Sequence, residues 1–370
     1  MIRILHIVTY MGLGGLETML MNYYRHMPRD RIQFDFLVHR EFNADYDKEI
    51  LSLGGKIYHF QRLIPWSRRY RRQLTAFLGS HPEYRIIHVH QDCFSAVALE
   101  CAKQCRIPVR IAHSHISSQD KNWKYPLKCY YKNKIPSAAT DFFACSQKAG
   151  EWMFEGHSFS VLPNAIDAAR FTYRPEAAKA IRRKLHIDIR ACVIGHVGRF
   201  HPQKNHSFLI DIFYEFLKHH PESILLLVGD GSGRAAIRRK INRLGISSHV
   251  CFTGSRGDVP DLLQAMDVFV FPSHYEGLGI SIVEAQAAGL PCLISDTIPA
   301  ECIVTKHLVV RYDLKKPPDA WAEKITSLLH LPRKDRTDEI RQAGYDLTQA
   351  AEKLETFYAE AKRRNRSWLF

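Results

Sequence analysis

Residues 268–284 read Val-Phe-Val-Phe-Pro-Ser-His-Tyr-Glu-Gly-Leu-Gly-Ile-Ser-Ile-Val-Glu, and this stretch decides the fold. The apolar run Val268–Phe271 is typical of a strand that is buried on both faces of a parallel sheet. A glycine-rich turn follows it and leads into a helix, with carboxylates at Glu276 and Glu284. The predicted order is therefore strand, acidic glycine turn, helix and second acid.

A helix that begins after such a turn presents free backbone N–H groups, which bind phosphate. Glycine lets the backbone approach a ligand that a Cβ would block. If the segment from Glu276 to Glu284 is mostly helical, the two acids lie roughly 12 Å apart, at about 1.5 Å per residue. We therefore expect them to contact opposite ends of a long ligand, and a nucleotide-sugar has that length.

The composition sets the class of protein. A chain of 370 residues suits two domains, and its contents of 46% hydrophobic and 24% charged residues are typical of soluble globular proteins. No apolar run reaches the ~18 residues that span a bilayer. The nine cysteines, in a chain without a secretory signal, indicate reduced thiols. We therefore expect a cytoplasmic protein.

Strand and helix patterns alternate in both halves of the chain, which predicts parallel sheets with helices on both faces. The predicted strands are Ile2–Val8, Phe34–Val38, Ile57–His59, Ile86–His90, Val109–Ala112, Phe142–Cys145, Cys192–Val197, Ser223–Val228, Val250–Thr253, Val268–Phe271 and Pro291–Ser295. Turn residues between 163 and 175 indicate a linker. We expect an N-terminal domain over 1–168, a C-terminal domain over 169–345, and a crossover helix with a basic tail over 346–370. The helical pattern there starts at about Asp338 and runs to Arg366.

The net charge of +14 indicates an anionic partner. Basic and aromatic residues gather in two clusters of the first half, and this mixture is typical of surfaces that dock on anionic membranes. The first cluster contains Arg62, Leu63, Ile64, Trp66, Arg68, Arg69, Tyr70, Arg71, Arg72 and Leu74; the second contains Lys121, Trp123, Lys124, Tyr125, Lys128, Tyr130, Tyr131, Lys132 and Lys134. A solvated helix face and loop is the alternative interpretation. We expect peripheral binding to the inner face of the cell membrane.

Two cations, Arg199 and Lys204, follow the predicted strand Cys192–Val197. In one loop they can grip a diphosphate, because arginine offers a fork of donors and lysine a compact charge. Taken alone, the pair can equally be solvated surface charge. The acidic glycine turn in the same domain favours the diphosphate.

The first predicted strand ends at a second glycine turn, Gly12–Gly15. It lacks the third glycine of a dinucleotide fingerprint. Its backbone can still bring N–H groups to a phosphate at the helix start, although a tight turn without a ligand explains it as well.

Histidines end two other predicted strands. His113 and His115 share one face by alternation, and either can hydrogen-bond a sugar hydroxyl or pack in the core. We interpret His88 and His90 as structural. Asp45 and Asp47 match the two-acid pattern with which some sugar transferases hold a metal, but they lie far from the phosphate-binding candidates. We therefore expect no metal site and no cofactor.

Together these motifs resemble the retaining family 4 glycosyltransferases, and nearly the whole chain is similar to bacterial enzymes of capsule and exopolysaccharide synthesis. The matching motifs are Gly14–Glu17, Leu162–Asp167, Gly198–Arg199, Lys204–Asn205, Val228–Gly231, Phe252–Gly254, Glu276–Gly279 and Glu284. Ala165 stands where the family usually has glycine. The resemblance implies the GT-B fold, in which two Rossmann-like domains face a deep cleft and a C-terminal helix crosses back to the first domain.

The resemblance also implies the roles of residues. It implies that Arg199 and Lys204 hold the donor diphosphate, that Glu284 binds the ribose and that Glu276 contacts the transferred sugar. The residues implied for donor binding are Gly14, Gly15, Arg199, Lys204, Gly254, Leu278, Gly279, Ile280 and Glu284. Those implied for catalysis are His113, His115, Arg199, Lys204 and Glu276.

The expected activity is transfer of a sugar from a nucleoside diphosphate, UDP above all, to an acceptor hydroxyl with retention of configuration. The expected acceptor is a glycan or a polyprenyl-diphosphate-linked sugar. Two alternatives stay open: a UDP-sugar 2-epimerase of the same architecture, and a basic nucleic-acid-binding protein. The second leaves Glu276 and Glu284 unexplained, because acids repel a phosphate backbone.

Overall fold

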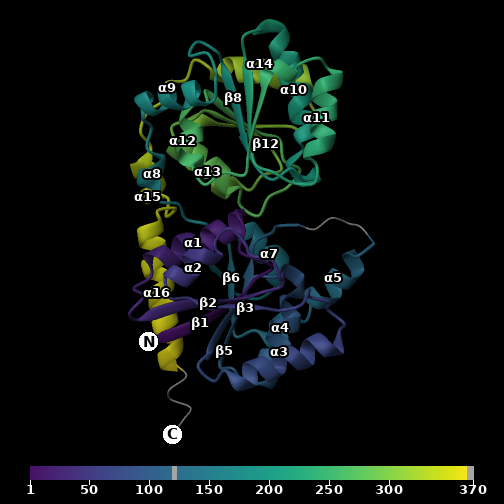
Figure 1. Ribbon diagram of the computed structural model, residues 1–370, viewed down its shortest axis with the longest axis vertical. Helices are drawn as coiled ribbons and strands as arrows, with labels where there is room; N and C mark the ends of the chain where they lie inside the picture. Colours follow the sequence, from purple (N-terminus) through teal and green to yellow (C-terminus); the bar gives the residue numbers. More distant parts are fainter. Residues whose placement is uncertain (119–122, 365–370) are drawn as a thin grey trace. The chain divides into compact units, whose positions relative to one another are not determined.

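The chain folds into two compact α/β units in a computed structural model that describes residues 1–118 and 123–364. The first unit comprises Met1–Ala165 and the C-terminal segment from Leu347, and the second comprises Ile166–Asp346. Each unit is built on its own parallel sheet (Figure 1). The predicted doubly wound α/β architecture is confirmed in both halves.

The sheet of the first unit has, within the described residues, seven parallel strands in the order β3-β2-β1-β4-β5-β6-β7. The strands are β1 Ile2–Ile7, β2 Ile32–Val38, β3 Ile57–His59, β4 Ile86–Val89, β5 Val109–Ser114, β6 Asp141–Ala144 and β7 Ser160–Val161. β2 is buried along its whole length, as expected of a strand that is covered on both faces. Because the chain proceeds outward from β1 in one direction and from β4 in the other, these neighbours form the switch point, where ligands bind in such sheets.

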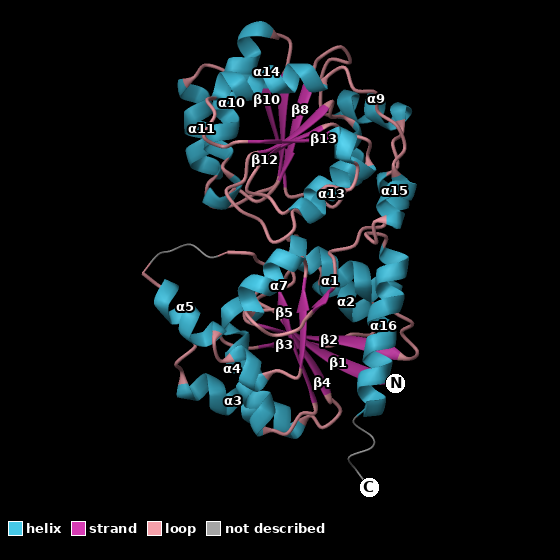
Figure 2. Ribbon diagram, turned by 180° about the vertical axis from the view of Figure 1, so that it is seen from behind, coloured by secondary structure: helices cyan, strands magenta, loops and turns pink. Residues whose placement is uncertain are grey.

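Helices cover both faces of this sheet (Figure 2). They are α1 Gly15–His26, α2 Asp47–Ser52, α3 Arg68–Ser80, α4 Ser95–Gln104, α5 Tyr125–Lys132, α6 Ile135–Ala138 and α7 Gln147–Phe154, together with the 3-10 turn η1 Asp92–Phe94. Ser146 caps α7, as predicted, by accepting a hydrogen bond from the N–H of Ala149.

The last helix, α16 Leu347–Arg364, returns to the first unit and packs beside α1 (Figure 1). Its buried residues recur at helical spacing, which gives one apolar stripe; they are Leu347, Ala350, Ala351, Leu354, Tyr358 and Ala361. These side chains join one core with residues of α1, β1, β2 and β5. The predicted crossover helix is therefore confirmed.

The second unit has a sheet of six parallel strands, counted over the described chain, in the order β10-β9-β8-β11-β12-β13. The strands are β8 Val193–Val197, β9 Ile224–Val228, β10 Val250–Gly254, β11 Val268–Phe271, β12 Cys292–Ser295 and β13 Val309–Tyr312. The helices are α8 Ala168–Phe171, α9 Pro175–Lys184, α10 His206–His219, α11 Arg234–Arg243, α12 Val259–Gln264, α13 Ile280–Ala287, α14 Pro318–Leu328 and α15 Thr337–Gln342, with 3-10 turns η2 Pro202–Lys204, η3 Ser247–His249, η4 Ala300–Cys302 and η5 Lys306–Leu308. Here β8 and β11 meet at the switch point.

Two sequence expectations about helices are wrong. The helix predicted from Asp338 to Arg366 is two helices, α15 and α16, because Gly344 adopts a left-handed conformation with φ +80° and ends α15. The helix after the acidic glycine turn begins only at Ile280, so Glu276 lies in the turn and the 12 Å spacing does not apply.

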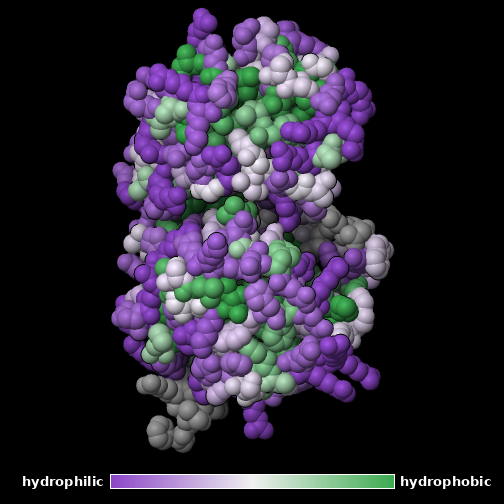
Figure 3. Space-filling model, viewed as in Figure 1, coloured by the Kyte–Doolittle hydropathy of each residue, from purple (hydrophilic) through white to green (hydrophobic). Residues whose placement is uncertain are grey.

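The visible surface of both units is largely hydrophilic, in line with the charge content (Figure 3). In the first basic cluster, α3 buries Tyr70, Leu74 and Leu78 and exposes Arg68, Arg69 and Arg72. Part of the basic charge is paired inside the unit: Arg71 and Lys134 with Glu100, and Lys132 with Glu155. Lys121 of the second cluster lies outside the described residues.

Candidate functional site

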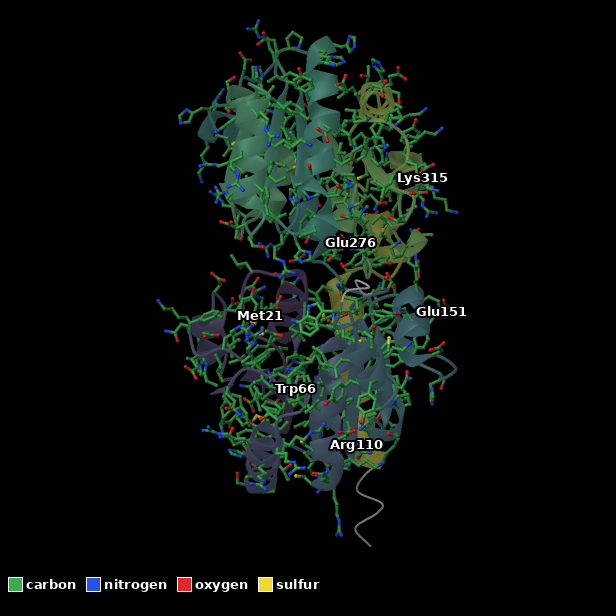
Figure 4. All side chains as sticks on the ribbon, turned by 90° about the vertical axis from the view of Figure 1, so that its right-hand side faces the viewer. Met21, Trp66, Arg110, Glu151, Glu276 and Lys315 are labelled. Carbon is green, nitrogen blue, oxygen red and sulfur yellow. The ribbon has the colours of Figure 1, made fainter. Side chains whose placement is uncertain are left out.

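The switch point of the second unit brings together two side chains that the sequence places 72 residues apart. Lys204, at the end of η2, extends its Nζ to 2.7 Å from Oε1 of Glu276 in the turn after β11. Both side chains are mostly buried, with exposed fractions of 17% and 8%. Figure 4 labels Glu276 near one end of the second unit. The sequence predicted separate roles for these residues, and the structure makes them an ion pair.

Hydrogen bonds between the two loops fix this pair. The N–H of His274 donates to the carbonyl of Gln203 at 2.9 Å, and the Gln203 side chain donates to the carbonyl of Tyr275 at 2.8 Å. The ammonium of Lys204 also lies 4.6 Å from the ring centroid of Phe271, on β11. The lysine side chain is therefore held by two contacts, with the strand and with the turn that the opening motif predicted.

Arg199 lies in the same loop, two residues after β8, and its side chain is exposed. It forms no ion pair with any acid in the described part of the chain. Lys204 is thus a fixed cation and Arg199 an available one, which is the combination that a mobile anionic ligand needs.

Glycines let three backbone segments meet beside this loop. Gly231, after β9, has φ +152°, and a Cβ there would lie 2.7 Å from the carbonyl oxygen of Phe200. The N–H of Gly198 donates to Val228, and the N–H of Gly229 donates to Gly254. Gly254 therefore lies beside Gly229, which separates it from the Arg199 loop, and the space beside its own Cβ position is open.

The amino end of α13 follows the Glu276 turn. Gly279 caps the helix in a left-handed conformation with φ +87°, after the buried Leu278, and Ile280 starts the helix. The first N–H groups of α13 are thus presented at the switch point, where they suit an anion.

Glu284 lies in the second turn of α13 and is partly buried. Burial raises the pKa of its carboxyl to about 7, while the charge of Arg170 on α8 opposes that shift. Near neutral pH this carboxyl can accept or donate a hydrogen bond, and the two hydroxyls of a ribose can use both roles.

The remaining predicted residues belong to the first unit. Gly14 caps α1, and Gly15 is the first residue of this helix. A Cβ on Gly14 would meet only the carboxylate end of the flexible Glu17 side chain, and the φ of Gly14, −114°, is open to other residues, so the turn does not by itself require glycine here. The turn is also tied to Asp45, whose carboxylate accepts from the N–H of Leu13 at 3.2 Å.

His113 and His115 belong to a cluster of five histidines on one face of the first sheet, with His6, His88 and His90. His113 is buried within β5, whereas His115 lies one residue beyond the strand and is half-buried. Hydrogen bonds join them in two chains. One runs from His6 to His90 at 3.1 Å and on to His115 at 2.9 Å.

The second chain runs from Tyr358 of α16 to His88 at 2.8 Å and from His88 to His113 at 3.1 Å. Burial lowers the pKa of His88, His90 and His113 well below the usual range, and that of His6 and His115 to about 3. All five imidazoles are therefore neutral.

Two triads of this cluster have ring nitrogens within 4.8 Å of one another, close enough to consider a metal ion: His6, His88 and His90, and His90, His113 and His115. Seven of the ten ring nitrogens of the five residues pair with a neighbour, and three have no partner among the residues that the structure describes: His6 Nε2, His113 Nε2 and His115 Nδ1. Neither triad includes a carboxylate to offset a buried divalent charge. The donor set fits a hydrogen-bond network better than a cation.

A cavity of about 350 Å³ lies at the carboxyl edge of the first sheet, and the sequence did not predict it. Three cations line it, Arg40, Arg62 and Lys128, together with Asp92. Asp92 has φ +48°, a strained conformation for a residue other than glycine, and such strain is common at functional sites. Burial raises the pKa of Asp92 to about 6, against the charge of Lys128. The cavity is suited to an anionic group beside a hydroxyl.

The predicted site residues thus form two groups. Arg199, Lys204, Gly254, Glu276, Leu278, Gly279, Ile280 and Glu284 lie in the second unit, at or after the carboxyl ends of β8, β10 and β11. Gly14, Gly15, His113 and His115 lie in the first unit, after β1 and at the end of β5.

Family models match both units. Residues 177–346 match the model described as glycosyl transferases group 1, and residues 13–170 match the model described as glycosyltransferase family 4. EpsF of Bacillus subtilis, which is named as a glycosyltransferase, is 35% identical over 359 residues that cover 94% of each chain. The chain belongs to the family 4 glycosyltransferases.

Another relative of this glycosyltransferase is named for the donor and the acceptor that it uses. A galactosyltransferase of Escherichia coli, named for UDP-galactose and N-acetylglucosamine-diphosphoundecaprenol, is 25% identical over 233 residues, or 60% of each chain. The structure of HepE of Anabaena in complex with UDP and glucose superimposes with a TM-score of 0.75 at 20% identity, over 100% of this chain and 99% of that one. This likeness shows the GT-B fold of the glycosyltransferase.

No described helix of the glycosyltransferase is both long enough and apolar enough to cross a membrane.

Proposed function

We propose that this glycosyltransferase moves a sugar from a UDP-sugar to an acceptor hydroxyl, with retention of configuration and without a metal, in the synthesis of a cell-surface polysaccharide. The observation that carries the proposal is the Lys204–Glu276 pair at the switch point of the second unit. In this pair, the ammonium of Lys204 would bind the diphosphate of the donor, and the carboxylate of Glu276 would bind its sugar.

The donor would lie along the carboxyl edge of the second sheet. Arg199 and Lys204 would bind the diphosphate, with the first N–H groups of α13 as further donors. Glu284 would hold the ribose, and Glu276 the hydroxyls of the sugar. HepE, which has the same fold, is known in complex with UDP and glucose, and this supports a uridine donor.

The chemical step requires stabilisation of charge on the leaving diphosphate. Preorganised cations and helix N–H groups supply this, and removal of one such donor commonly costs ~3 kcal/mol. The leaving phosphate is the group that we propose to assist deprotonation of the acceptor, so no protein nucleophile is required. His113 or His115 would contact the sugar near the reacting carbon.

The acceptor would occupy the cavity of the first unit. Arg40, Arg62 and Lys128 suit a diphosphate, and Asp92 suits a sugar hydroxyl. A polyprenyl-diphosphate-linked sugar has both groups, and the Escherichia coli relative is named for such an acceptor. The exposed arginines of α3 would bring the enzyme to the anionic membrane that carries this lipid.

The test is a donor screen that measures release of the nucleoside diphosphate from a panel of sugar nucleotides, each with and without a diphosphate-linked acceptor. We expect UDP release that depends on the acceptor, in the presence of a chelator, and a product whose anomeric coupling in the NMR spectrum matches the donor. A 2-epimerase would instead convert the donor alone into its epimer. An inverted product, or a requirement for a divalent ion, would refute that part of the proposal.

A further inference from the structure

One wall of the cavity in the first unit is built by the 3-10 turn η1, which follows β4 at the switch point of the sheet. Asp92 is the first residue of this turn and has φ +48°. Its neighbours Gln91, Cys93 and Phe94 also line the cavity. The turn packs against α5, which brings Lys128 to the same cavity. A strained residue therefore lies at the part of the sheet where ligands bind.

The fold itself does not use the strained side chain. The carboxylate of Asp92 forms no hydrogen bond and no ion pair with any residue that the structure describes, although the charge of Lys128 acts on it from α5. Three other described residues besides glycines have positive φ, and each ends a helix or a 3-10 turn, where this conformation is common: Arg106, His186 and Asn205. Asp92 instead begins its turn. A strained residue without a partner in the fold is typical of a group that is held for a ligand.

The deepest part of the cavity is polar but uncharged. His39, His90 and Gln91 line it with exposed fractions of 2%, 4% and 8%. Burial lowers the pKa of His39 to about 4 and that of His90 well below its usual range, so both imidazoles are neutral at neutral pH. Neutral imidazole and amide groups both donate and accept hydrogen bonds, which suits the hydroxyls of a sugar.

The charged side chains of the lining are less buried than this floor. Arg62 is exposed, and Arg40, Lys128 and Asp92 are half-buried. The three cations favour a diphosphate at this outer rim. An ionised carboxylate repels phosphate oxygens but accepts a hydrogen bond from a hydroxyl, so Asp92 fits the sugar and not the diphosphate. The volume of about 350 Å³ is near the lower end of ligand sites, roughly 300–1,000 Å³, and suits a single sugar better than a long glycan.

We infer that Asp92 is a specificity-determining residue for the acceptor, and that it accepts a hydrogen bond from a hydroxyl of the sugar that carries the diphosphate. This role rests on the proposed function and adds an orientation of the acceptor to it. The sugar would lie toward the neutral floor, and the diphosphate toward Arg62 at the rim. A sugar without this hydroxyl would leave the desolvated carboxylate unpaired, which penalises the wrong acceptor more than a missing contact alone.

Binding of the acceptor can be measured without a donor, by titration calorimetry on the full-length protein. The probes are short-chain alkyl diphosphates of N-acetylglucosamine, glucose and galactose, each with deoxy analogues that lack one hydroxyl. For the parent ester that binds most tightly, we expect one deoxy analogue to have a dissociation constant about 10- to 100-fold higher, because a hydrogen bond to a charged group is lost. In Asp92→Gly, the parent and this analogue should bind equally. If no ester binds, or if Asp92→Gly keeps the wild-type difference, the inference is overturned.

Thermal unfolding separates this role from a structural one. Glycine adopts positive φ without strain, and Asp92→Gly also removes a carboxylate that has no partner in the described fold. We expect the melting temperature of Asp92→Gly to equal or exceed that of the wild type, although the selectivity is lost. A lower melting temperature would show that the carboxylate supports the fold, and would contradict the inference.

Two control variants are matched to this change. Arg106→Gly makes the same backbone substitution at a positive φ of 55°, at an exposed position after α4. Glu41→Gln removes an exposed acid beside Arg40, at a position that is not among the described residues of the lining. Both should keep the wild-type selectivity between the parent and the deoxy ester. Loss of selectivity in either control would assign the effect to backbone change or net charge, and not to the Asp92 carboxylate.

Turnover distinguishes a failure of the proposed function from a failure at Asp92. With a UDP-sugar as donor, kcat/KM for the parent acceptor should fall about 10- to 100-fold in Asp92→Gly, whereas kcat/KM for the deoxy analogue should stay as in the wild type. If the wild type transfers sugar from no UDP-sugar, the proposed function is refuted. The calorimetric comparison then still decides whether Asp92 recognises the hydroxyl.

Discussion

Lys204 and Glu276 form a mostly buried ion pair, with Nζ 2.7 Å from Oε1, between the loops that follow β8 and β11. Each residue therefore supports the position of the other. A variant of either one changes both the ligand contacts and the electrostatics of the fold. Variants of the pair can therefore be used to separate an effect on turnover from an effect on the free energy of unfolding.

In Lys204→Ala the Glu276 carboxylate is left without its lysine in a mostly buried position. We expect turnover to fall at least a hundredfold, because a donor to the diphosphate is lost. We also expect the free energy of unfolding to drop by about 2–4 kcal/mol, because removing one member of a buried ion pair takes away an attraction that offsets the desolvation of the other. Steady-state kinetics and urea unfolding measure the two effects.

The double variant Lys204→Ala with Glu276→Gln is the control for this experiment. It removes the buried negative charge of Glu276 as well and should recover most of the lost stability, but none of the turnover. Near-normal turnover in Lys204→Ala would contradict the assigned role of the lysine.

Glu284 should make the stability of the second unit depend on pH. Its pKa in the folded protein, about 7, lies above the unfolded value of 4.5, so the folded state holds the proton more tightly. The free energy of unfolding should therefore fall as pH rises from about 4.5 to 7. Glu284→Gln lacks this penalty and should be more stable than the wild type at pH 8, by about 1–3 kcal/mol.

The gain in Glu284→Gln should shrink as pH falls toward 4.5, where the wild-type carboxyl is protonated in both states. Thermal unfolding across this range is the measurement. If the carboxylate binds the ribose, the same variant should bind UDP more weakly at pH 8. A variant that is less stable than the wild type at pH 8 would contradict the raised pKa.

Gly231 should tolerate a methyl group poorly, for reasons of both conformation and space. Gly231→Ala forces a Cβ against the backbone oxygen of Phe200 and should displace the loop that carries Arg199. Gly245 also has positive φ, +70°, but the space around it is open. We expect Gly245→Ala to cost roughly 1 kcal/mol from backbone strain alone, and Gly231→Ala to cost more.

Activity separates the two alanine variants further. Gly231→Ala should raise KM for the donor, whereas Gly245→Ala should leave it unchanged. Equal losses of stability with unchanged KM in both variants would show that the loop after β9 does not position Arg199.

The acceptor cavity predicts a selective effect at Arg62. Arg62→Ala should raise KM for a diphosphate-linked acceptor by about three- to tenfold, since it removes one exposed charge-assisted contact. Slow hydrolysis of the donor in the absence of an acceptor should not change. A neutral glycoside with the same sugar is the control substrate, and an equal rise in its KM would argue against a phosphate contact.

The exposed arginines of α3 predict binding to anionic vesicles. Charge reversal at Arg68 and Arg72 should abolish cosedimentation with vesicles that contain acidic lipid, because each cation near such a surface contributes about 1 kcal/mol. Reversal at Arg239 and Arg243 on α11 makes the same change at the same helical spacing and should have little effect. Equal binding by both variants, or binding without acidic lipid, would remove the case for membrane docking.

Sequence patterns predicted the features that depend on neighbours along the chain. The strand Val268–Phe271 has the predicted bounds. Its four residues are all apolar and all buried, so the apolar run in the sequence marks both ends of the strand. Ile57–His59 is also a strand as predicted. The end of α15 could have been predicted from Gly344, since glycine is the residue that most often adopts the left-handed conformation after a helix.

Local sequence patterns could not predict contacts between segments that are distant in the chain. The approach of Lys204 to Glu276 depends on β8 and β11 being neighbours in the sheet, and strand order is not encoded by local periodicity. The approach of Tyr358 to His88 spans 270 residues. The interpretation of His88 as structural considered its strand alone, and the helix that contacts it could not be placed from spacing.

The return of α16 to the first unit has a consequence for biosynthesis. The ribosome delivers the stripe from Leu347 to Ala361 after every other part of both cores, although this stripe covers residues of β1 and β2 that were made first. The second unit, which is continuous from Ile166 to Asp346, has its whole sequence as soon as that segment emerges. Part of the apolar face of the amino-terminal half therefore stays uncovered during synthesis until α16 has been made.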